Sequence, residues 1–440
     1  MNYNQLINLA KEKGFSDIEI TESSSSVTNI TVFSGEIDQN HTHDEVTITV
    51  RAIYNDKMAY FTTSNADEDP NFILDTLKEN ALSLTTQEEF EIFGGSEEYP
   101  EWEEKDGGFS KISLAEKVNL LLVLEKEVKA YDERIILVPH CGYQELIGRK
   151  RIVNSKGLDL EKRKEYGVVY VQAVGKENEQ TQSAFEVEIK TSFADLDPIL
   201  IAQKVAKKTI KKLNADSLPS KVYPVVFENE AMADLLEVFT SFFSGEAAVK
   251  KLTPLLGKEG EKVFSELLTI VDEAIYPDSP HNEPFDDEGV ACYKKEVVDK
   301  GVFKTFLHNL KTAKYFKTKS TGNGFKAGDS ISVRGVNFYV KPGERKLEEM
   351  IADIEEGVLI TDLAGLHAGA NPVNGDFSAQ SSGFLIKDGR IDRPVTLIVV
   401  SGNFVEALNQ IEEIGSDLKF NSEGIGCPSI RFKGLSISGK

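Results

Sequence analysis

Apolar and polar residues alternate in several stretches of the first half of the chain, a pattern typical of strands with one buried face. The stretches 17–22, 27–33, 45–53 and 58–63 all show it. Asn55-Asp56, between the last two stretches, is a residue pair that favours a turn. The pattern therefore predicts an antiparallel meander in this region.

Helical periodicity also occurs in the first half. Apolar residues spaced by three and four positions predict a short helix that ends near Gly14, a helix over 113–131 and another over 198–213. Ser113 and Glu116 match a capping box at the start of the second of these helices. Further strands are predicted over 134–141, 143–153 and 166–190, with residues 154–157 (NSKG) as a hairpin turn.

The pattern changes near residues 214–222, where Asn, Asp, Ser and Pro cluster between two periodic segments. A strand over 222–227 and an apolar-faced helix over 232–243 follow this boundary. The remaining chain is mostly strand-like and rich in glycine, except for a helix predicted over 346–356. We therefore predict an α+β fold in two domains: an N-terminal α+β domain (1–215) with an antiparallel sheet and flanking helices, and a β-rich C-terminal domain (216–440).

The charge of the chain limits its partners. Its 440 residues include 72 acidic and 50 basic residues, which gives a formal net charge of −22. This charge repels phosphate groups, so we expect no direct binding to nucleic acid or to an anionic membrane. The three cysteines, Cys141, Cys292 and Cys427, are well separated and form no disulfide framework. Since we find no signal-peptide pattern and no long apolar span, we expect a cytoplasmic protein with no membrane-spanning segment.

Common catalytic and metal-binding motifs are absent from the sequence. HExxH, CxxC, EF-hand, phosphate-binding-loop and nucleophile-elbow patterns do not occur. His41 and His43 would share one face of a strand, but a zinc site needs three or four ligands. We interpret these two residues as part of a polar turn before the strand at 45–53. His140 and Cys141 are neighbours in sequence and cannot chelate one ion without distortion.

Two polar segments are candidates for a functional surface. Asp286, Asp287 and Glu288 form an acidic run closed by Gly289. Such a run could bind a cation or perturb a neighbouring pKa, although its composition favours a solvated turn. Residues 362–378 are the second segment, a long glycine-rich stretch that we interpret as a loop, and polar loops of this length are often functional. The candidate side chains within it are His367, Asn371, Asp376 and Ser378.

Several segments, in their order along the chain, resemble the TldD/PmbA family, long described as modulators of DNA gyrase and classed with metallopeptidases (peptidase U62-like). The resemblance extends over essentially the whole sequence and is most specific in the second half. The main matching segments are LPSKVYPVVF (218–227), LLTIVDE (267–273), PFDDEGV (284–290), LHNLKTA (307–313), GVLITDLAGLHAGANPVNGDFSAQSSGFLIKDGRI (357–391), SGNFVEALNQIEEIGSDL (401–418) and PSIRFKGLSISG (428–439).

The family has two branches that differ in their metal site. One branch carries a helical HExxxH motif that binds zinc, aided by a cysteine in a C-terminal loop, and the TldE/PmbA branch lacks this motif. The corresponding positions of this sequence are Glu237, Val238 and Phe242, in a region without any histidine. Phe242 cannot bind a metal and Cys427 alone cannot hold zinc, so we interpret Cys427 as a buried residue. The resemblance thus implies the branch without the zinc motif, with no cofactor held by this chain.

The resemblance implies a non-catalytic TldE/PmbA-type subunit. It would pair with a TldD-type paralogue that carries zinc, or with itself when isolated, and enclose a cavity in a metalloprotease that degrades or processes unfolded peptides. Asp286, Asp287 and the four candidates between 362 and 378 are then expected to line this cavity. Two alternatives stay open: a stand-alone peptidase with an unrecognised metal site at Asp286, Asp287 and His367, and a protein-binding modulator of DNA gyrase.

Overall fold

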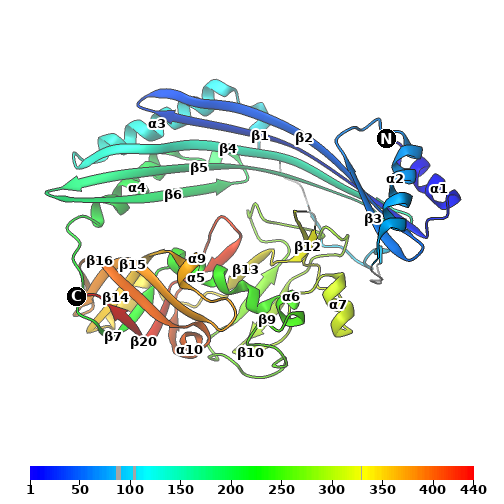
Figure 1. The fold of residues 1–440 in the computed structure, drawn as a ribbon. Helices are drawn as coiled ribbons and strands as arrows, with labels where there is room; N and C mark the ends of the chain where they lie inside the picture. The colour runs from blue at the N-terminus through cyan, green and yellow to red at the C-terminus, as the bar shows by residue number, and fades with distance from the viewer. Residues whose placement is uncertain (86–90, 103–105, 329) are drawn as a thin grey trace.

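A long antiparallel sheet forms the first half of the protein (Figure 1). The computed structural model describes residues 1–85, 91–102, 106–328 and 330–440. Neighbouring strands of this sheet all pair antiparallel, and its longest strands have 17–20 residues. The strand order is β3-β2-β1-β4-β5-β6, with β1 (Asp17–Phe33), β2 (Glu36–Tyr54), β3 (Lys57–Thr63), β4 (Ile135–Asn154), β5 (Asp159–Glu177) and β6 (Gln180–Lys190).

The predicted meander is present, but its strands are longer than the sequence pattern indicates. The stretches 17–22 and 27–33 belong to one strand, β1, because Ser23–Ser26 pair with both β2 and β4. Main-chain hydrogen bonds on both sides keep this run of serines extended without any apolar alternation. In the same way, the predicted strands 134–141 and 143–153 form the single strand β4.

Strand β2 corrects the interpretation of the two neighbouring histidines. It begins at Glu36, so His41 and His43 lie within a strand, where they pair with Asn29 and Val27 of β1, and the predicted polar turn is wrong. Both histidines are exposed. The stretch 166–190, predicted as one run, divides into β5 and β6 by a turn after Glu177.

Helices pack on the sheet towards both of its ends. Ile20 of β1 packs in a core with α1 and α2, and Ile30 packs in a core with α3 and α4. Because alternate residues of a strand point to the same face, these helices share one face of the sheet, and Ser24 and Ser26 lie between them. The helices are α1 (Tyr3–Glu12), α2 (Pro70–Ser83), α3 (Leu114–Tyr131) and α4 (Pro198–Lys211).

Capping residues mark the start of these helices in the sequence, although one of the helices was not predicted. The helix over 113–131 is confirmed: the Ser113 hydroxyl accepts a hydrogen bond from the Glu116 N–H, and the Glu116 carboxylate accepts one from the Ser113 N–H. The helix α2 was not predicted. Its signals are nevertheless in the sequence, since the Asp69 carboxylate caps the helix and Pro70 occupies its first position.

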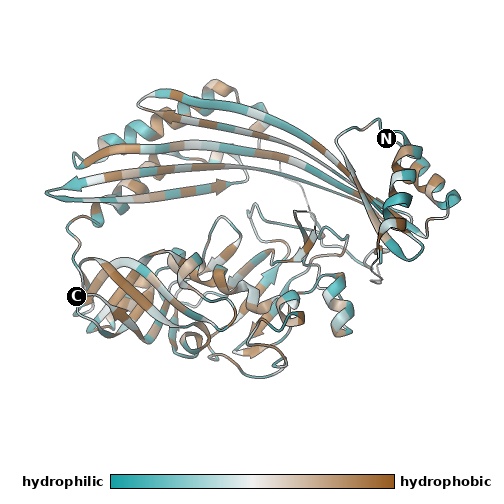
Figure 2. Cartoon of the chain, viewed as in Figure 1, coloured by the Kyte–Doolittle hydropathy of each residue, from teal (hydrophilic) through white to brown (hydrophobic). Residues whose placement is uncertain are grey.

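The second half of the chain forms a barrel and a second sheet around a shared apolar core (Figure 1). Strand β16 pairs with both β15 and β20, so β7, β14, β15, β16 and β20 close on themselves, and β17 is added at β20. Brown, apolar stretches dominate the barrel strands, whereas brown and teal alternate along the long first sheet (Figure 2). The barrel strands are β7 (Lys221–Phe227), β14 (Glu356–Ala364), β15 (Asp376–Lys387), β16 (Arg390–Asn403), β17 (Ile411–Ile414) and β20 (Ile430–Ser438).

The second sheet has the strand order β10-β9-β8-β13-β19-β18, and a separate hairpin, β11-β12, lies close by. Together with the first sheet and its helices, these elements confirm an α+β protein with a β-rich C-terminal part. No helix in the described ranges is long and apolar enough to cross a bilayer. The strands are β8 (Ile270–Glu273), β9 (Lys295–Asp299), β10 (Val302–Phe303), β11 (Gly324–Ala327), β12 (Ser330–Val333), β13 (Asn337–Val340), β18 (Lys419–Phe420) and β19 (Ile425–Cys427).

Helices in the second half of the chain are short and differ in detail from the predictions. The helix expected over 232–243 begins earlier, as α5 (Asn229–Phe239), and continues as a 3₁₀ turn (Thr240–Phe243). The stretch 362–378 is not one long loop, because β14 and β15 occupy its two ends. The other helices are α6 (Gly245–Val249), α7 (Leu310–Phe316), α8 (Leu347–Ala352, predicted over 346–356), α9 (Leu366–Gly369) and α10 (Phe404–Asn409).

Ion pairs join the two halves of the chain in two zones, and the halves are called the first and the second domain after the predicted division. The predicted boundary between residues 215 and 216 falls in the segment between α4 and β7. In both zones, lysines of the first domain face carboxylates of the second. The pairs of one zone are Lys150–Asp287 (2.5 Å), Lys162–Glu283 (2.5 Å) and Lys164–Glu283 (2.8 Å), and those of the other are Lys208–Glu230 (2.8 Å) and Lys212–Asp362.

Candidate functional site

A pocket of about 460 Å³ lies at the C-terminal end of α5. This is the place to which the sequence resemblance assigns the metal motif. The pocket is lined by residues of α5, α6, β12, β13 and β19 and of the segment after α9. Of these elements, α5, α6, β12 and β13 are labelled in Figure 1. Its lining residues are Glu237, Thr240, Ser241, Ser244, Glu246, Ala247, Lys250, Leu252, Leu307, Val333, Arg334, Gly335, Phe338, Pro372, Val373, Glu423 and Ile425.

One polar face of the α5 region points into this pocket. Glu237, Thr240, Ser241 and Ser244 follow at intervals of three and four residues, which places them along one side of the helix and its 3₁₀ continuation. The Ser241 Oγ is buried and has no hydrogen-bond partner among the described residues. Ser244 accepts a hydrogen bond from the Glu246 N–H and thereby caps α6.

An asparagine fixes the position of the Glu237 carboxylate. The Nδ2 of Asn421 donates to the Oε2 of Glu237 at 2.6 Å. The Oδ1 of Asn421 accepts from the N–H groups of Glu423 and Ile425 at 3.0 and 3.1 Å, so the amide is held in one orientation. Burial raises the pKa of Glu237, the Asn421 hydrogen bond opposes this, and the carboxylates of Glu423 and Asp234 raise the pKa further.

The other positions of the motif do not fit a zinc ion. Phe242 is fully buried, and its ring centroid lies 5.3 Å from that of Phe239 and 6.2 Å from that of Phe404. Val238 packs against the same core. Cys427 is fully buried, and burial raises the pKa of its thiol, which disfavours the thiolate that binds metals. Within the described part of the chain, no three His, Cys, Asp or Glu side chains are arranged to hold a metal ion.

The acidic run at 286–288 is buried, so the favoured interpretation as a solvated turn is wrong. Asp286 is fully buried, and its two carboxylate oxygens accept hydrogen bonds from three backbone N–H groups, of Glu288, Val290 and Gly324. Burial and the neighbouring Glu288 carboxylate raise the pKa of Asp286, against the effect of these donors. Asp286 therefore holds the turn at 286–290 against the β11 end.

Asp287 belongs to the junction between the domains. Its Oδ1 lies 2.5 Å from the Nζ of Lys150, and its Oδ2 accepts from the Lys326 N–H at 2.8 Å. Sequence reasoning missed this burial because Lys150 comes from a strand of the other domain, which brings a compensating charge that no local pattern reveals. The described contacts do not bring His367 near Asp286 or Asp287, the three residues of the alternative metal site.

The glycine-rich segment reaches the pocket through residues other than the predicted ones. His367, Asn371, Asp376 and Ser378 are exposed and do not line the pocket, whereas Pro372 and Val373 do. Two of the predicted residues shape the loop instead. The Oδ1 of Asn371 accepts from the Val373 N–H at 2.9 Å, and the carboxylate of Asp376 accepts from the amides of Asn374 and Asn403 at 2.8 and 3.0 Å.

The pocket residues that sequence reasoning missed include Thr240, Ser241, Glu246, Lys250 and Glu423. Thr240 and Ser241 had a usable signal, because they interrupt the apolar face of a predicted helix at positions that continue the face of Glu237. The others gave no local signal, since they come from separate segments that meet only in the folded chain.

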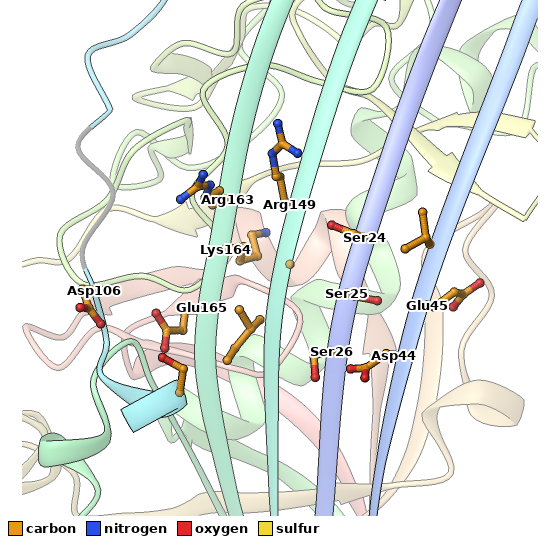
Figure 3. A pocket seen from close by; sticks show the side chains of 14 residues that line it. Ser24, Ser25, Ser26, Asp44, Glu45, Asp106, Arg149, Arg163, Lys164 and Glu165 are labelled. Carbon is orange, nitrogen blue, oxygen red and sulfur yellow. The ribbon is translucent and has the colours of Figure 1, made fainter. Parts of the chain in front are cut away.

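A larger depression of about 740 Å³ lies on the helix-bearing face of the first sheet, between the two groups of helices (Figure 3). Figure 3 shows Ser24–Ser26 of β1 beside Asp44 and Glu45 of β2, with Arg149 and Arg163 on β4 and β5. None of the predicted site residues lines it. This depression forms because no helix packs on the central serines of β1.

The fold and this pocket define an α+β protein whose helix at the pocket carries Glu237, Val238 and Phe242 in place of a zinc motif. Family models give the class. The PmbA/TldA metallopeptidase C-terminal domain matches residues 220–439, the central domain matches 107–213 and domain 1 matches 18–82. The chain belongs to the PmbA/TldD family, as the sequence resemblance indicated.

Solved structures and named relatives agree with this assignment. The chain is similar to the crystal structure of a modulator of DNA gyrase from Thermotoga maritima, with 32% identity, 99% of both chains covered and a TM-score of 0.93. It is similar to TldE from Thermococcus kodakarensis, with 26% identity, 99% and 100% covered and a TM-score of 0.90. A metalloprotease PmbA homolog from Haemophilus influenzae is 28% identical over 331 residues, which are 74% of this chain and 71% of that protein.

Proposed function

We propose that this chain is the non-catalytic TldE/PmbA-type subunit of a cytoplasmic TldD/TldE-like metalloprotease. In this assembly a TldD-type paralogue carries the zinc, and this chain completes the cavity and binds unfolded peptide. The isolated chain pairs with itself. Its own residues contribute binding surface and no catalytic group.

The state of the α5 helix carries this proposal. Zinc hydrolysis needs protein ligands around an open coordination position and a carboxylate beside the bound water. Here Phe242 is packed in the core and Val238 offers no ligand atom. The Glu237 carboxylate is held by Asn421 in the pocket, which suits binding of a substrate group. The similarity to a TldE structure over nearly the whole chain supports the same branch.

A reconstitution experiment tests the proposal. This chain, its TldD-type paralogue and their mixture are incubated separately with fluorescently labelled unfolded casein. We expect cleavage in the mixture alone, and no cleavage when the paralogue carries alanine at the first histidine of its HExxxH motif. Full activity of the paralogue without this chain would argue against a subunit role.

Elemental analysis of the purified chain separates the stand-alone peptidase from the subunit. We expect far less than one zinc per chain, because the pocket lacks a ligand set. Stoichiometric zinc, with peptide cleavage that a chelator abolishes, would favour the stand-alone enzyme.

Binding to gyrase is a second candidate, favoured by the name of the Thermotoga maritima relative. The net charge of −22 opposes contact with DNA and permits contact with a basic protein surface. A pull-down with purified gyrase at physiological salt tests it: retention on the immobilised chain would support this role, and no retention would remove it.

A further inference from the structure

The pocket beside α5 contains more acidic than basic side chains that are free to meet a ligand. Glu237, Glu246 and Glu423 contribute carboxylates, and Lys250 and Arg334 contribute cations. The guanidinium of Arg334 is engaged elsewhere, since it lies 3.9 Å from the Phe325 ring centroid and 3.7 Å from the Glu283 carboxylate. Lys250 is exposed at the rim. The free carboxylates among the lining residues therefore favour a ligand with a positive charge.

One oxygen atom of the Glu237 carboxylate has capacity to accept a hydrogen bond from a ligand. The Oε2 of Glu237 accepts from Asn421, whereas its Oε1 accepts no hydrogen bond from the described residues. One turn further on, the Oγ of Ser241 has no partner among them either, but this atom is buried away from the pocket surface. A carboxylate oxygen that is free to accept favours a ligand with a charged N–H donor.

The pocket also has apolar lining. Leu252 and Val373, two of its lining residues, each leave 43% of their surface exposed. An aliphatic chain placed against them would cover this surface and gain the free energy of burial. The pocket thus combines a carboxylate with apolar lining residues, which are Leu252, Leu307, Val333, Phe338, Pro372, Val373 and Ile425.

We infer that this pocket binds a basic side chain of an unfolded peptide, with its aliphatic stem on the apolar lining residues and its cationic head on the carboxylate of Glu237. This inference rests on the proposed peptide-binding function and adds a preference for lysine or arginine at one position of the peptide. Glu237 is the residue that determines this preference. Asn421 positions the carboxylate of Glu237 through its own two backbone contacts.

Binding of matched peptides tests the inference. Short fluorescein-labelled peptides of glycine, serine and alanine differ only in one central residue, which is lysine, norleucine or glutamate. Fluorescence anisotropy gives the Kd of each peptide for the full-length chain, alone and mixed with its paralogue. Because charge-assisted hydrogen bonds contribute roughly 1.5–3 kcal/mol, we expect the lysine peptide to bind at least ~10-fold more tightly than the norleucine peptide.

Variants assign the preference to the pocket. Glu237→Gln should remove most of the advantage of lysine over norleucine and leave the norleucine affinity unchanged. Lys250→Gln should strengthen lysine-peptide binding by about twofold, because it removes an exposed like charge at the rim. The matched control is Glu261→Gln, an exposed glutamate outside the pocket, which should change neither affinity.

The outcomes separate this inference from the proposed function. Equal binding of the lysine and norleucine peptides would overturn the basic preference and leave the peptide-binding subunit intact. An equal loss of both affinities in Glu237→Gln would also overturn it, because it would give Glu237 a merely structural role. Failure of all three peptides to bind, alone and in the mixture, would count against the proposed function itself.

Discussion

Substitution of Glu283 with glutamine should weaken the junction between the two domains. The Glu283 side chain is 6% exposed, and its two oxygens contact the ammonium groups of Lys162 at 2.5 Å and Lys164 at 2.8 Å. Glutamine has almost the same shape but carries no charge. The substitution therefore removes the electrostatic part of both contacts and leaves two lysines poorly compensated.

The size of the effect follows from what each lysine retains. Removing one partner of a buried ion pair typically costs about 3–5 kcal/mol. Lys162 keeps the Phe285 carbonyl at 2.7 Å and has the Asp287 carboxylate at 4.0 Å, and Lys164 is 29% exposed and regains some hydration. We therefore expect a loss of about 2–3 kcal/mol, at or just below the lower limit of this range.

Urea unfolding followed by tryptophan fluorescence measures this loss locally. Trp102 is the single tryptophan of the chain and lines a small pocket at the junction with Lys164 and Asn282. With a urea dependence of roughly 2–3 kcal/mol per molar, the Trp102 midpoint should fall by about 1 M. Because domains of a chain can unfold separately, far-UV circular dichroism is recorded in parallel.

An exposed ion pair supplies the control. Lys262 and Glu266 lie 3.3 Å apart in a pair whose carboxylate side chain is 77% exposed. Exposed ion pairs contribute little to stability, so Glu266→Gln should lower the free energy of unfolding by less than about 0.5 kcal/mol. If Glu283→Gln and Glu266→Gln shift the Trp102 midpoint equally, the argument from burial is refuted.

Three further predictions concern the core, a turn and the pH dependence. Phe242→His should destabilise the second domain by about 3 kcal/mol in urea unfolding, because it removes a fully buried ring. Elemental analysis of this variant should still find no bound zinc, and zinc binding would contradict the packing argument. Asn154→Ala should lower the free energy of unfolding by about 2 kcal/mol in the same assay, because the Oδ1 of Asn154 accepts hydrogen bonds from the Lys156 and Leu158 N–H groups in the hairpin. An unchanged free energy of unfolding would mean that the turn forms without these hydrogen bonds. Burial raises the pKa of Glu288 to about 7, so the folded state retains this proton at higher pH than the unfolded chain, and its stabilising contribution is lost as the pH rises from about 5 to 8. Glu288→Gln should therefore have a Tm that rises relative to the wild type across this window, and a constant Tm difference would refute the assigned pKa.

The elements that the sequence predicted best are those with a local signal at their ends. The capping box of Ser113 and Glu116 fixed the start of α3, and the turn at 154–157 correctly joined β4 to β5. The long strands were underestimated, because Ser23–Ser26 stay extended through pairing with two neighbours and not through their own propensity. Such pairing depends on residues far away in the sequence.

The residues of the candidate site were likewise predicted only in part. The resemblance located the altered helix and hence Glu237, which does line a pocket. Composition suggested solvation for Asp286 and Asp287, whereas folding buries both against backbone donors and a lysine of the other domain. The side chains of Glu246 and Glu423 reach the same pocket from separate segments, and no spacing rule along the chain connects them.

The closure of the barrel sets an order for folding during synthesis. Every described strand of the first sheet lies between Asp17 and Lys190, so this sheet has all its partners once those residues have left the ribosome. Strand β20 (Ile430–Ser438), in contrast, sits between β7 and β16 and pairs with both. Until this late segment emerges, β7 exposes an unpaired edge, which is a hazard for aggregation. The barrel of the second domain therefore cannot close until its final strand has been synthesised. A chain shortened by that strand would keep its first domain and lose the barrel.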